Sequence, residues 1–355
     1  MKHVVWFALA SCLFALTASA QESYFYKKRM YGSEALFNPL SLVLNASFDI
    51  IQLDGHSRAF KSIRYAEGFS NVLRNITRPF GPISRYGWGN FVADQILPLH
   101  LTRKDAQWWP NYQLHLIGGG MNYTMLREWY HVYGVPSPSL FAIGTLAVKA
   151  LLNEAIENGA VSGDNVDPIA DLLIFDPAGI VLFSFEGVNE FFSKELNLAD
   201  WSLQPSLTFA PAALHNNGQY FSIKWRFPFS ERWHLFYYFG MNGLIGLSYK
   251  LPDGRAISLG GGLRAKQLVL VNAATNKQTL DLVWNIGAFY DKDNSLMASL
   301  FVSGLTDYTV SANLYPGIID LGGFTPGVWI VVARGGKLLA GITTVWAPGL
   351  GIKTE

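Results

Sequence analysis

Residues 221–229 read Phe-Ser-Ile-Lys-Trp-Arg-Phe-Pro-Phe, so that apolar side chains alternate with polar ones and with a proline. The same period of two appears in residues 280–290 and 307–314. Alternation of this kind predicts β-strands that have one apolar and one polar face. Turn sequences separate such segments, and they are found at residues 216–218, 252–254, 291–294 and 335–336. The region 201–355 is therefore predicted to form an antiparallel β-barrel of about 8–10 strands.

The region before residue 200 has a helical pattern instead. An apolar segment begins at Ser137-Pro138 and ends near Asn158-Gly159, which are typical start and stop signals of a helix. Two Asp-Pro pairs, at Asp167 and Asp176, are interpreted as helix N-caps followed by proline. Further helices are predicted over 39–52, 60–75, 86–96, 111–130 and 177–196. The fold class is α+β, with a mostly helical domain at 21–200 before the barrel.

The first 20 residues have the features of a secretory signal peptide. A short basic head precedes the apolar residues 4–16, and Ala18-Ser19-Ala20 is a typical cleavage site. A membrane anchor is the weaker alternative, because a spanning helix needs about 20 apolar residues. Cleavage removes Cys12, the single cysteine, which excludes thiol catalysis and thiolate metal sites. We expect an exported chain that begins at Gln21.

The composition excludes several classes of protein. Charged residues make up only 15% and hydrophobic residues 50% of the chain, which does not fit a disordered protein. There are 27 Lys and Arg against 26 Asp and Glu, so no excess of positive charge supports nucleic-acid binding. The glycines at 118–120 lack the Lys-Ser/Thr ending of a phosphate loop, so no nucleotide site is expected. Close packing of helices is predicted at these glycines.

The alternating strands have two interpretations, because any half-buried antiparallel sheet alternates. In an outer-membrane barrel the apolar face contacts lipid and the polar groups line the lumen. The predicted signal peptide, the strand lengths and the many aromatic residues near strand ends favour this interpretation. The terminal Glu355 is less typical, since many such barrels end with an aromatic residue. The residues predicted to face the lumen are Lys224, Arg226, Arg264, Lys266, Asp281 and Asp307.

A His/Glu/Asp group in the helical region is the candidate catalytic site. Glu154 and Glu157 share one face of the same predicted helix, and His115 and Asp171 belong to neighbouring helical segments. Such a group can bind a divalent metal or act as a general acid and base. The structural alternatives are a core histidine bonded to a carboxylate and a solvated helix end. The sequence assigns no particular metal or cofactor.

The same region resembles an exported bacterial family known as domain of unknown function 3943. The resemblance rests on a His-then-Gly element at His115, a helix with Glu154 and Glu157, and Pro-Ile-Ala-Asp-Leu at 168–172. It extends over residues 111–186, and Leu116 departs from the proline that the family usually has there. The family implies a location in the bacterial envelope but supplies no reaction.

We therefore expect a bacterial outer-membrane β-barrel protein in contact with membrane lipids, with a structural, anchoring or ligand-docking role. One alternative is an envelope hydrolase that acts on lipid or glycolipid through the His/Glu/Asp site. Another is a periplasmic protein that binds an apolar ligand inside a soluble barrel. Neither nucleic acid nor a nucleotide is expected as a partner, and the sequence identifies no protein partner.

Overall fold

The computed structural model describes residues 22–98, 109–272, 277–345 and 348–354. The predicted signal peptide and its cleavage site thus lie outside the described residues. The protein is α+β, as the sequence predicts. Its contacts divide it into two units, which we call the helical unit and the sheet unit. Among the described residues, the helical unit comprises those within 22–26, 64–190 and 268–280, and the sheet unit comprises those within 27–63, 191–267 and 281–354.

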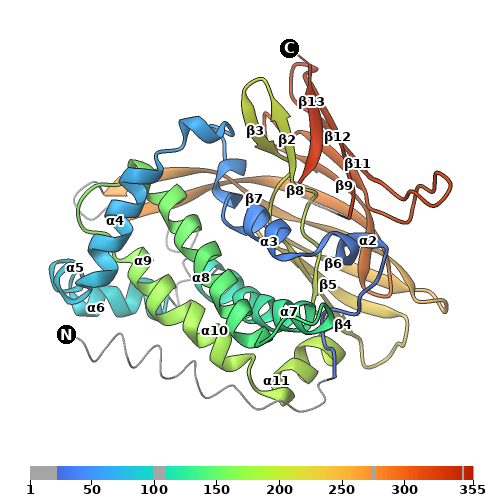
Figure 1. Cartoon of the computed structure of the whole chain (residues 1–355), viewed down its shortest axis with the longest axis horizontal. Coiled ribbons are helices and arrows are strands. Elements are labelled where there is room, and N and C mark those ends of the chain that lie inside the picture. Colours follow the sequence, from blue (N-terminus) through green and yellow to red (C-terminus); the bar gives the residue numbers. More distant parts are fainter. Residues whose placement is uncertain (1–21, 99–108, 273–276, 346–347, 355) are drawn as a thin grey trace. The chain divides into compact units, whose positions relative to one another are not determined.

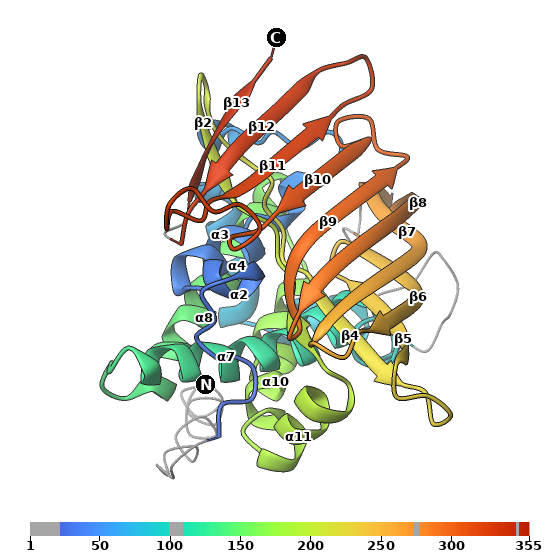
Figure 2. The ribbon, with the colours of Figure 1, turned by 90° about the vertical axis from the view of Figure 1, so that its right-hand side faces the viewer.

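In the part of the chain that the structure describes, 13 strands form one sheet. Figure 2 shows its strands β4 to β13 side by side. The first six are β1 (Ala199–Asp200), β2 (Ser206–Phe209), β3 (Ala212–His215), β4 (Phe221–Arg226), β5 (Trp233–Phe239) and β6 (Asn242–Lys250). The others are β7 (Arg255–Asn272), β8 (Lys277–Lys292), β9 (Ser295–Ser303), β10 (Val310–Leu314), β11 (Gly327–Val332), β12 (Leu338–Thr343) and β13 (Gly349–Lys353). The spatial order is β1-β4-β5-β6-β7-β8-β9-β10-β11-β12-β13-β2-β3.

The prediction of a closed barrel of about 8–10 strands is wrong. The sheet is open, with β1 and β3 at the two ends of its 13-strand order. Closure needs pairing between the two end strands, but among the described residues β1 pairs with β4 and β3 pairs with β2. Alternation within a strand does not encode which strands pair. Strands β1 and β2 nevertheless belong to one segment, residues 199–209. This segment pairs with β4 through β1 and with β13 through β2.

The turns of the sheet fall where the sequence predicts them. Asp293 and Asn294, between β8 and β9, have φ of +49° and +68°. Two successive residues of positive φ are what a type I′ hairpin turn requires. Gly335 and Gly336 have φ of +92° and +84° between β11 and β12, a conformation that favours glycine. The hairpins are thus set by local sequence.

Strand length differs along the sheet. Strands β6 to β9 contain 9, 18, 16 and 9 residues. Strands β10 to β13 have only 5 or 6 residues each. A tilted strand needs about 9–11 residues to cross a bilayer, so the predicted length is reached in β6 to β9 alone among these.

Several helices belong to the sheet unit, so the prediction of one N-terminal helical domain is wrong. They are the α-helices α2 (Gly32–Leu36) and α3 (Pro39–Ala46), the 3₁₀ helices η1 (Asp49–Gln52) and η2 (Phe60–Ser62), and the π-helix η7 (Phe191–Glu195). As expected, α3 begins at Asn38, whose side chain accepts a hydrogen bond from the Ser41 N–H at 2.9 Å. Polar residues of this segment bond to the sheet: the Tyr220 hydroxyl donates to Gln52 Oε1 at 2.7 Å. The segment is therefore part of the core of the sheet unit.

The helical unit is built around helix α8 (Pro138–Glu157), which packs against α4 (Tyr65–Thr77) and α7 (Gly119–Val132) (Figure 1). Its other helices are α5 (Phe80–Tyr86), α6 (Trp88–Phe91), η3 (Val92–Ile96), η4 (Trp109–Gly118), η5 (Asn158–Ala160), α9 (Asp167–Ala170), η6 (Asp171–Phe175), α10 (Asp176–Leu182) and α11 (Glu186–Glu190). Helix α8 has the bounds predicted from Pro138 and Asn158.

The glycines at the start of α7 allow close packing, as predicted. A Cβ atom on Gly120 would lie 2.7 Å from the Gly179 carbonyl oxygen and would also overlap the ring of Phe183. A Cβ on Gly179 would lie 2.6 Å from the carbonyl oxygen of Leu116. Helices α7 and α10 thus touch backbone to backbone, which fixes the position of η4 beside α10.

One helix among those described, Pro138–Ala160, is long and apolar enough to cross a membrane, and Asp167–Leu182 with Glu186–Glu195 forms a bent pair that passes the same test. A helix in the core of a domain has the same composition, and 44% of the apolar window in Pro138–Ala160 is buried inside the protein. Helix length therefore does not by itself indicate a membrane span here.

Candidate functional site

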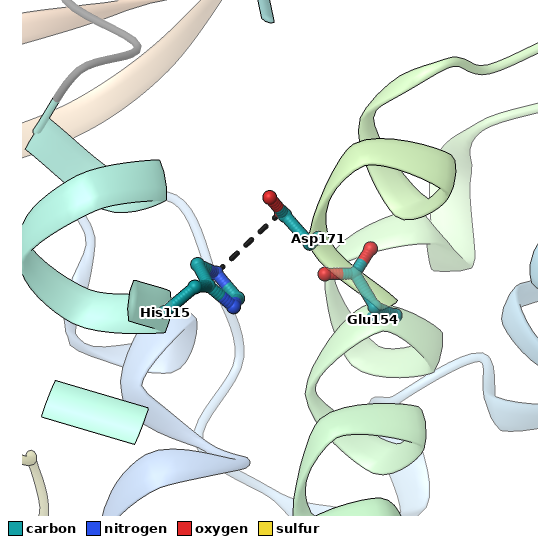
Figure 3. A group of neighbouring side chains, drawn as sticks. All are labelled: His115, Glu154 and Asp171. Atoms are coloured by element: carbon teal, nitrogen blue, oxygen red, sulfur yellow. Dashed lines mark ion pairs between the residues drawn. The ribbon is translucent and has the colours of Figure 1, made fainter. Parts of the chain in front are cut away.

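The predicted His/Glu/Asp group converges in the helical unit. His115 lies in η4, Glu154 near the end of α8, and Asp171 at the start of η6, and all three side chains point toward a common centre (Figure 3). One ligand atom from each lies within 4.8 Å of the others. All three residues are buried. We call His115, Glu154 and Asp171 the His/Glu/Asp cluster.

The histidine is held between two aspartates. Its Nδ1 atom lies 3.0 Å from Oδ1 of Asp176, which is a hydrogen-bonding distance. Its Nε2 atom lies 3.5 Å from Oδ2 of Asp171, which is longer than a charge-assisted hydrogen bond. The two ring nitrogens therefore have different roles, and Nε2 faces the centre of the cluster.

Asp176 is a site residue that sequence reasoning missed, and its interpretation as an N-cap is wrong. Its side chain makes no cap hydrogen bond, because α10 continues directly from η6. The Asp176 N–H bonds to the carbonyl of Asp171, five residues earlier, so a π-helical turn joins the two aspartates. In a regular α-helix, residues five apart lie about 140° apart around the axis. The wider turn brings both carboxylates toward His115.

Asp167 has no side-chain cap hydrogen bond either, so its interpretation as an N-cap is also wrong. It lies in the turn before Asp171 and affects the site through its charge. Glu157 lies one turn after Glu154 on α8, is half-buried, and is not one of the three converging ligands. Its negative charge nonetheless raises the pKa of the Glu154 carboxyl. The structure thus brings three of the four predicted catalytic residues together and places the fourth beside them.

Burial shifts the protonation of these carboxyls. It raises the pKa of Glu154 well above its usual range, and the nearby charges of Glu157 and Asp167 raise it further. It also raises the pKa of Asp171 strongly, with the charges of Asp167 and Glu154 acting in the same direction. Each carboxyl therefore requires a proton or another positive charge close by.

Asp176 behaves differently. Burial raises the pKa of its carboxyl, but the charges of His115 and Lys149, together with the hydrogen bond from His115, lower that pKa below its usual value. An ionised Asp176 is only an acceptor, so His115 Nδ1 is the donor in their bond. In the neutral form of His115, Nδ1 carries the proton and the lone pair is on Nε2.

The second functional feature is the outward face of the sheet, which is apolar. Trp225 and Trp284 are 58% and 52% exposed, and Ile352 is 75% exposed. We call the exposed apolar side chains of β4 to β13 that belong to the sheet unit the outer face. They are Trp225, Trp233, Leu235, Ile245, Leu247, Ile257, Leu259, Leu263, Trp284, Ile286, Leu300, Val302, Leu314, Ile330, Val332, Ile342, Leu350 and Ile352.

The outer face forms rows that cross many strands. One row runs from Trp225 through Leu235 and Leu247 to Leu259, each residue paired with the next. A second runs across β8 to β13 through paired residues Ala288, Leu300, Ala312, Ile330, Ala340 and Ile352. A domain surrounded by water rarely exposes a continuous apolar surface larger than a few hundred Å². The rows therefore indicate a surface that contacts an apolar medium or partner.

The opposite, inner face is buried and combines polar side chains with aromatic ones such as Phe236 and Phe289. Lys224, next to Trp225, is only 7% exposed, and its Nζ lies 2.7 Å from Oδ1 of Asp291. Further buried polar residues of this face are Ser222, His234, Ser248, Ser258, Arg264, Asn285, Ser299, Ser303, Ser311, Asn313 and Thr343. The sheet thus differs from a usual half-buried sheet, whose exposed face is polar: its exposed face is apolar, and its buried face holds polar groups beside the aromatic core.

The six polar residues predicted to line a lumen have different positions. Lys224 and Arg264 are buried on the inner face. Lys266 and Asp281 are half-buried, with 3.6 Å between their charged atoms. The structure contradicts the prediction for the other two: Arg226 at the end of β4 and Asp307 before β10 are exposed, because both lie at the rim of the sheet.

Tyr308 does not continue the outward alternation that residues 307–314 predict. It is buried at 6% exposure, and its ring lies 4.4 Å from the guanidinium carbon of Arg58. Strand β10 begins only at Val310, so the period of two does not extend back to Tyr308.

The inner aromatic residues fill the core rather than line a cavity. Trp201, Phe236, Tyr238 and Phe289 form one buried cluster, with ring centroids 4.7–6.3 Å apart. A pocket in the sheet unit lies elsewhere, lined by His56, Arg58, Thr208, Phe209, His215 and Lys353 among others. The core of the sheet unit therefore gives no support to an apolar ligand held among these rings.

Aromatic side chains also gather at one end of β5 and β6. Trp233 pairs with Tyr249, with ring centroids 4.9 Å apart, and the Arg232 guanidinium donates to the Tyr249 hydroxyl at 3.1 Å. Lys250 follows directly. Aromatic rings beside basic residues at strand ends are typical of the boundary between lipid and water.

Comparisons of this chain with models of known protein families, with curated proteins and with solved structures gave no match. The resemblance to domain of unknown function 3943 therefore stays a prediction.

Proposed function

We propose that the protein is a bacterial cell-envelope protein whose sheet is embedded in the outer membrane, where its outer face contacts lipid. The observation that carries this proposal is the contrast between the two faces of β4 to β13. Apolar side chains cover the outer face, while the charged pair of Lys224 and Asp291 is buried on the inner one. Water disfavours so many exposed apolar side chains on one face, and hydrocarbon favours them.

The ends of the sheet bear on this proposal, because peptide groups in hydrocarbon must all be hydrogen-bonded. The segment 199–209 pairs with β4 near one end of the strand order and with β13 near the other. The Trp201 N–H donates to the Tyr220 carbonyl at 2.8 Å, and the Gly349 N–H donates to the Pro205 carbonyl at 2.9 Å. The pairing reduces the number of free peptide groups that the membrane would meet.

The role that follows is structural, anchoring or ligand-docking. The sheet attaches the chain to the membrane, and the segment Lys27–Ile63 fills its inner side through contacts such as Tyr220 with Gln52. Under this proposal the embedded sheet keeps the helical unit attached to the membrane. Membrane lipids are the proposed partners.

Fractionation of the expressed full-length chain tests this proposal. We expect the protein in the outer-membrane pool, resistant to an alkaline wash and released by detergent. Recovery in the soluble periplasmic pool would contradict it and would favour the alternative of a periplasmic binding protein. A washed-off fraction at the membrane would mean peripheral attachment, which also contradicts an embedded sheet.

A hydrolase acting on envelope lipid or glycolipid is the second candidate. It is favoured by one observation, the convergence of His115, Glu154 and Asp171 within 4.8 Å. The burial of all three is less favourable, because a substrate must reach the reacting groups. Release of fatty acid or sugar from purified envelope lipid, abolished in His115→Gln and retained in His131→Gln, would support this function. Equal rates in both variants would remove it.

A further inference from the structure

We propose that the His/Glu/Asp cluster binds one divalent transition-metal ion, with Zn²⁺ the best fit. The ligands are Nε2 of His115 and one carboxylate oxygen each from Glu154 and Asp171. This inference is independent of the membrane proposal, because every residue involved belongs to the helical unit.

The distances fit an ion better than they fit direct contacts. Zn²⁺ bonds to imidazole nitrogen and carboxylate oxygen are about 2.0–2.2 Å, so two ligands of a tetrahedral ion lie about 3.4 Å apart. His115 Nε2 and Asp171 Oδ2 are 3.5 Å apart, and the three ligand atoms all lie within 4.8 Å. A modest inward movement of Glu154 completes a three-ligand site.

Asp176 prepares the histidine for this role. Metal-bound histidines almost always donate their second ring N–H to a carboxylate or carbonyl, which fixes the tautomer and the ring orientation. His115 has this arrangement: Nδ1 lies 3.0 Å from Asp176 Oδ1 and Nε2 faces the cluster. Asp176 is thus a positioning residue. The π-helical turn at η6 is what allows Asp171 and Asp176 to act on the same ring.

A second observation points to a missing ligand. Oδ1 of Asp171 is buried and has no hydrogen-bond partner, and the side chain, only 5% exposed, lies beside His115. Oδ2 of Asp176 is buried and unpartnered as well. Unpaired carboxylate oxygens in a protein interior are costly, and a cation removes that cost.

The donor set narrows the class of ion. One imidazole nitrogen with two carboxylate oxygens suits Zn²⁺, Fe²⁺ or Mn²⁺ more than Ca²⁺ or Mg²⁺, which prefer all-oxygen sites. Three protein ligands leave one tetrahedral position for water, as in catalytic rather than structural zinc sites. Because the site is buried, the ion enters as the chain folds.

The test is metal content after refolding. The full-length chain is unfolded in urea, refolded into detergent with Zn²⁺, passed over a desalting column with a weak chelator, and analysed by mass spectrometry. We expect about one Zn²⁺ per chain. A folded chain that retains none overturns the inference.

Conservative variants locate the ion. His115→Gln and Asp171→Asn should lose it, and Asp176→Asn should raise the dissociation constant about 10–100-fold. His131→Gln is the matched control, because His131 is exposed on α7 and distant in sequence from the ligands. Unchanged Zn²⁺ content in both ligand variants overturns the site.

A spectroscopic measurement serves where a variant fails to fold. Co²⁺ in the wild-type chain should give the intense visible absorption of a four-coordinate ion, and one equivalent of Zn²⁺ should abolish it. Absence of that absorption in a folded wild-type chain that has been refolded with Co²⁺ contradicts the proposed coordination.

Discussion

The outer face of the sheet and the His/Glu/Asp cluster differ in which side chains meet the surroundings: the outer face exposes apolar side chains, and the cluster buries ionisable ones. On the sheet, apolar side chains such as Trp284 lie outward and the charges lie within. In the helical unit, Glu154 and Asp171 are buried and Asp176 is half-buried, with their carboxyl groups around one histidine. The charge of the buried Lys149 acts on Glu154 and Asp176. Apolar surroundings stabilise the first arrangement, and a proton or a cation stabilises the second. The membrane and metal proposals each supply such a component.

The largest effect is expected from breaking the buried ion pair of the inner face. Lys224→Met leaves the Asp291 carboxylate without its partner at 2.7 Å and should lower the free energy of unfolding by about 3–5 kcal/mol. The double variant Lys224→Met/Asp291→Leu should recover most of that loss, because no charge is left unpaired. Urea unfolding of detergent-solubilised protein measures both. A single variant as stable as wild type would mean that water reaches the pair.

A charge on the outer face should have the next largest effect. Leu259→Arg places a guanidinium in the row of paired apolar residues and should cost about 2–4 kcal/mol if lipid surrounds it. Val148→Arg is the matched control on α8, since Val148 is 57% exposed on the helical unit. There the change should stay within about 0.5 kcal/mol. The free energy of unfolding of each variant is measured for protein folded into lipid vesicles. Similar losses at both positions would show that the two surfaces meet the same surroundings.

The helical unit itself can be tested by two glycine substitutions. Gly120→Ala adds a Cβ that meets Phe183 and the Gly179 carbonyl, and should cost about 1–3 kcal/mol through overpacking. Gly144→Ala on α8 meets nothing within 4 Å and should stabilise the protein by about 0.5–1 kcal/mol. Thermal unfolding shows whether each variant is less or more stable than the wild-type protein. A neutral Gly120→Ala would show that α7 and α10 are not in contact at this point.

The sequence predicts the parts of the fold that depend on local patterns. The alternation around Trp225 and Trp284 identifies outward positions, because the side-chain period of a strand is two. The turn at Asp293-Asn294 and the start of α3 at Asn38 follow from the conformational preferences of those residues. These features require no knowledge of distant contacts.

The errors arise where geometry departs from the regular period or depends on distant pairing. The sheet is open because its end strands β1 and β3 do not pair with each other among the described residues, and the choice of partner strands depends on contacts far apart in the chain. Asp176 was assigned to a cap because its role depends on a π-helical turn, which a period of 3.6 residues does not describe. The alternation over residues 307–314 predicts Tyr308 to face outward, because alternation does not show that the strand begins only at Val310. The convergence of His115, Glu154 and Asp171 was predicted from residue types, but its burial was not.

Accessibility of the outer face to lipid tests the central claim most directly. With Cys12, the single cysteine of the chain, replaced by serine, Leu247→Cys and Val148→Cys each provide one site for a nitroxide spin label. In lipid vesicles, we predict that the label at 247 collides mainly with oxygen dissolved in the bilayer, and the label at 148 mainly with a water-soluble nickel chelate. Equal access of the nickel chelate to both labels would contradict the account.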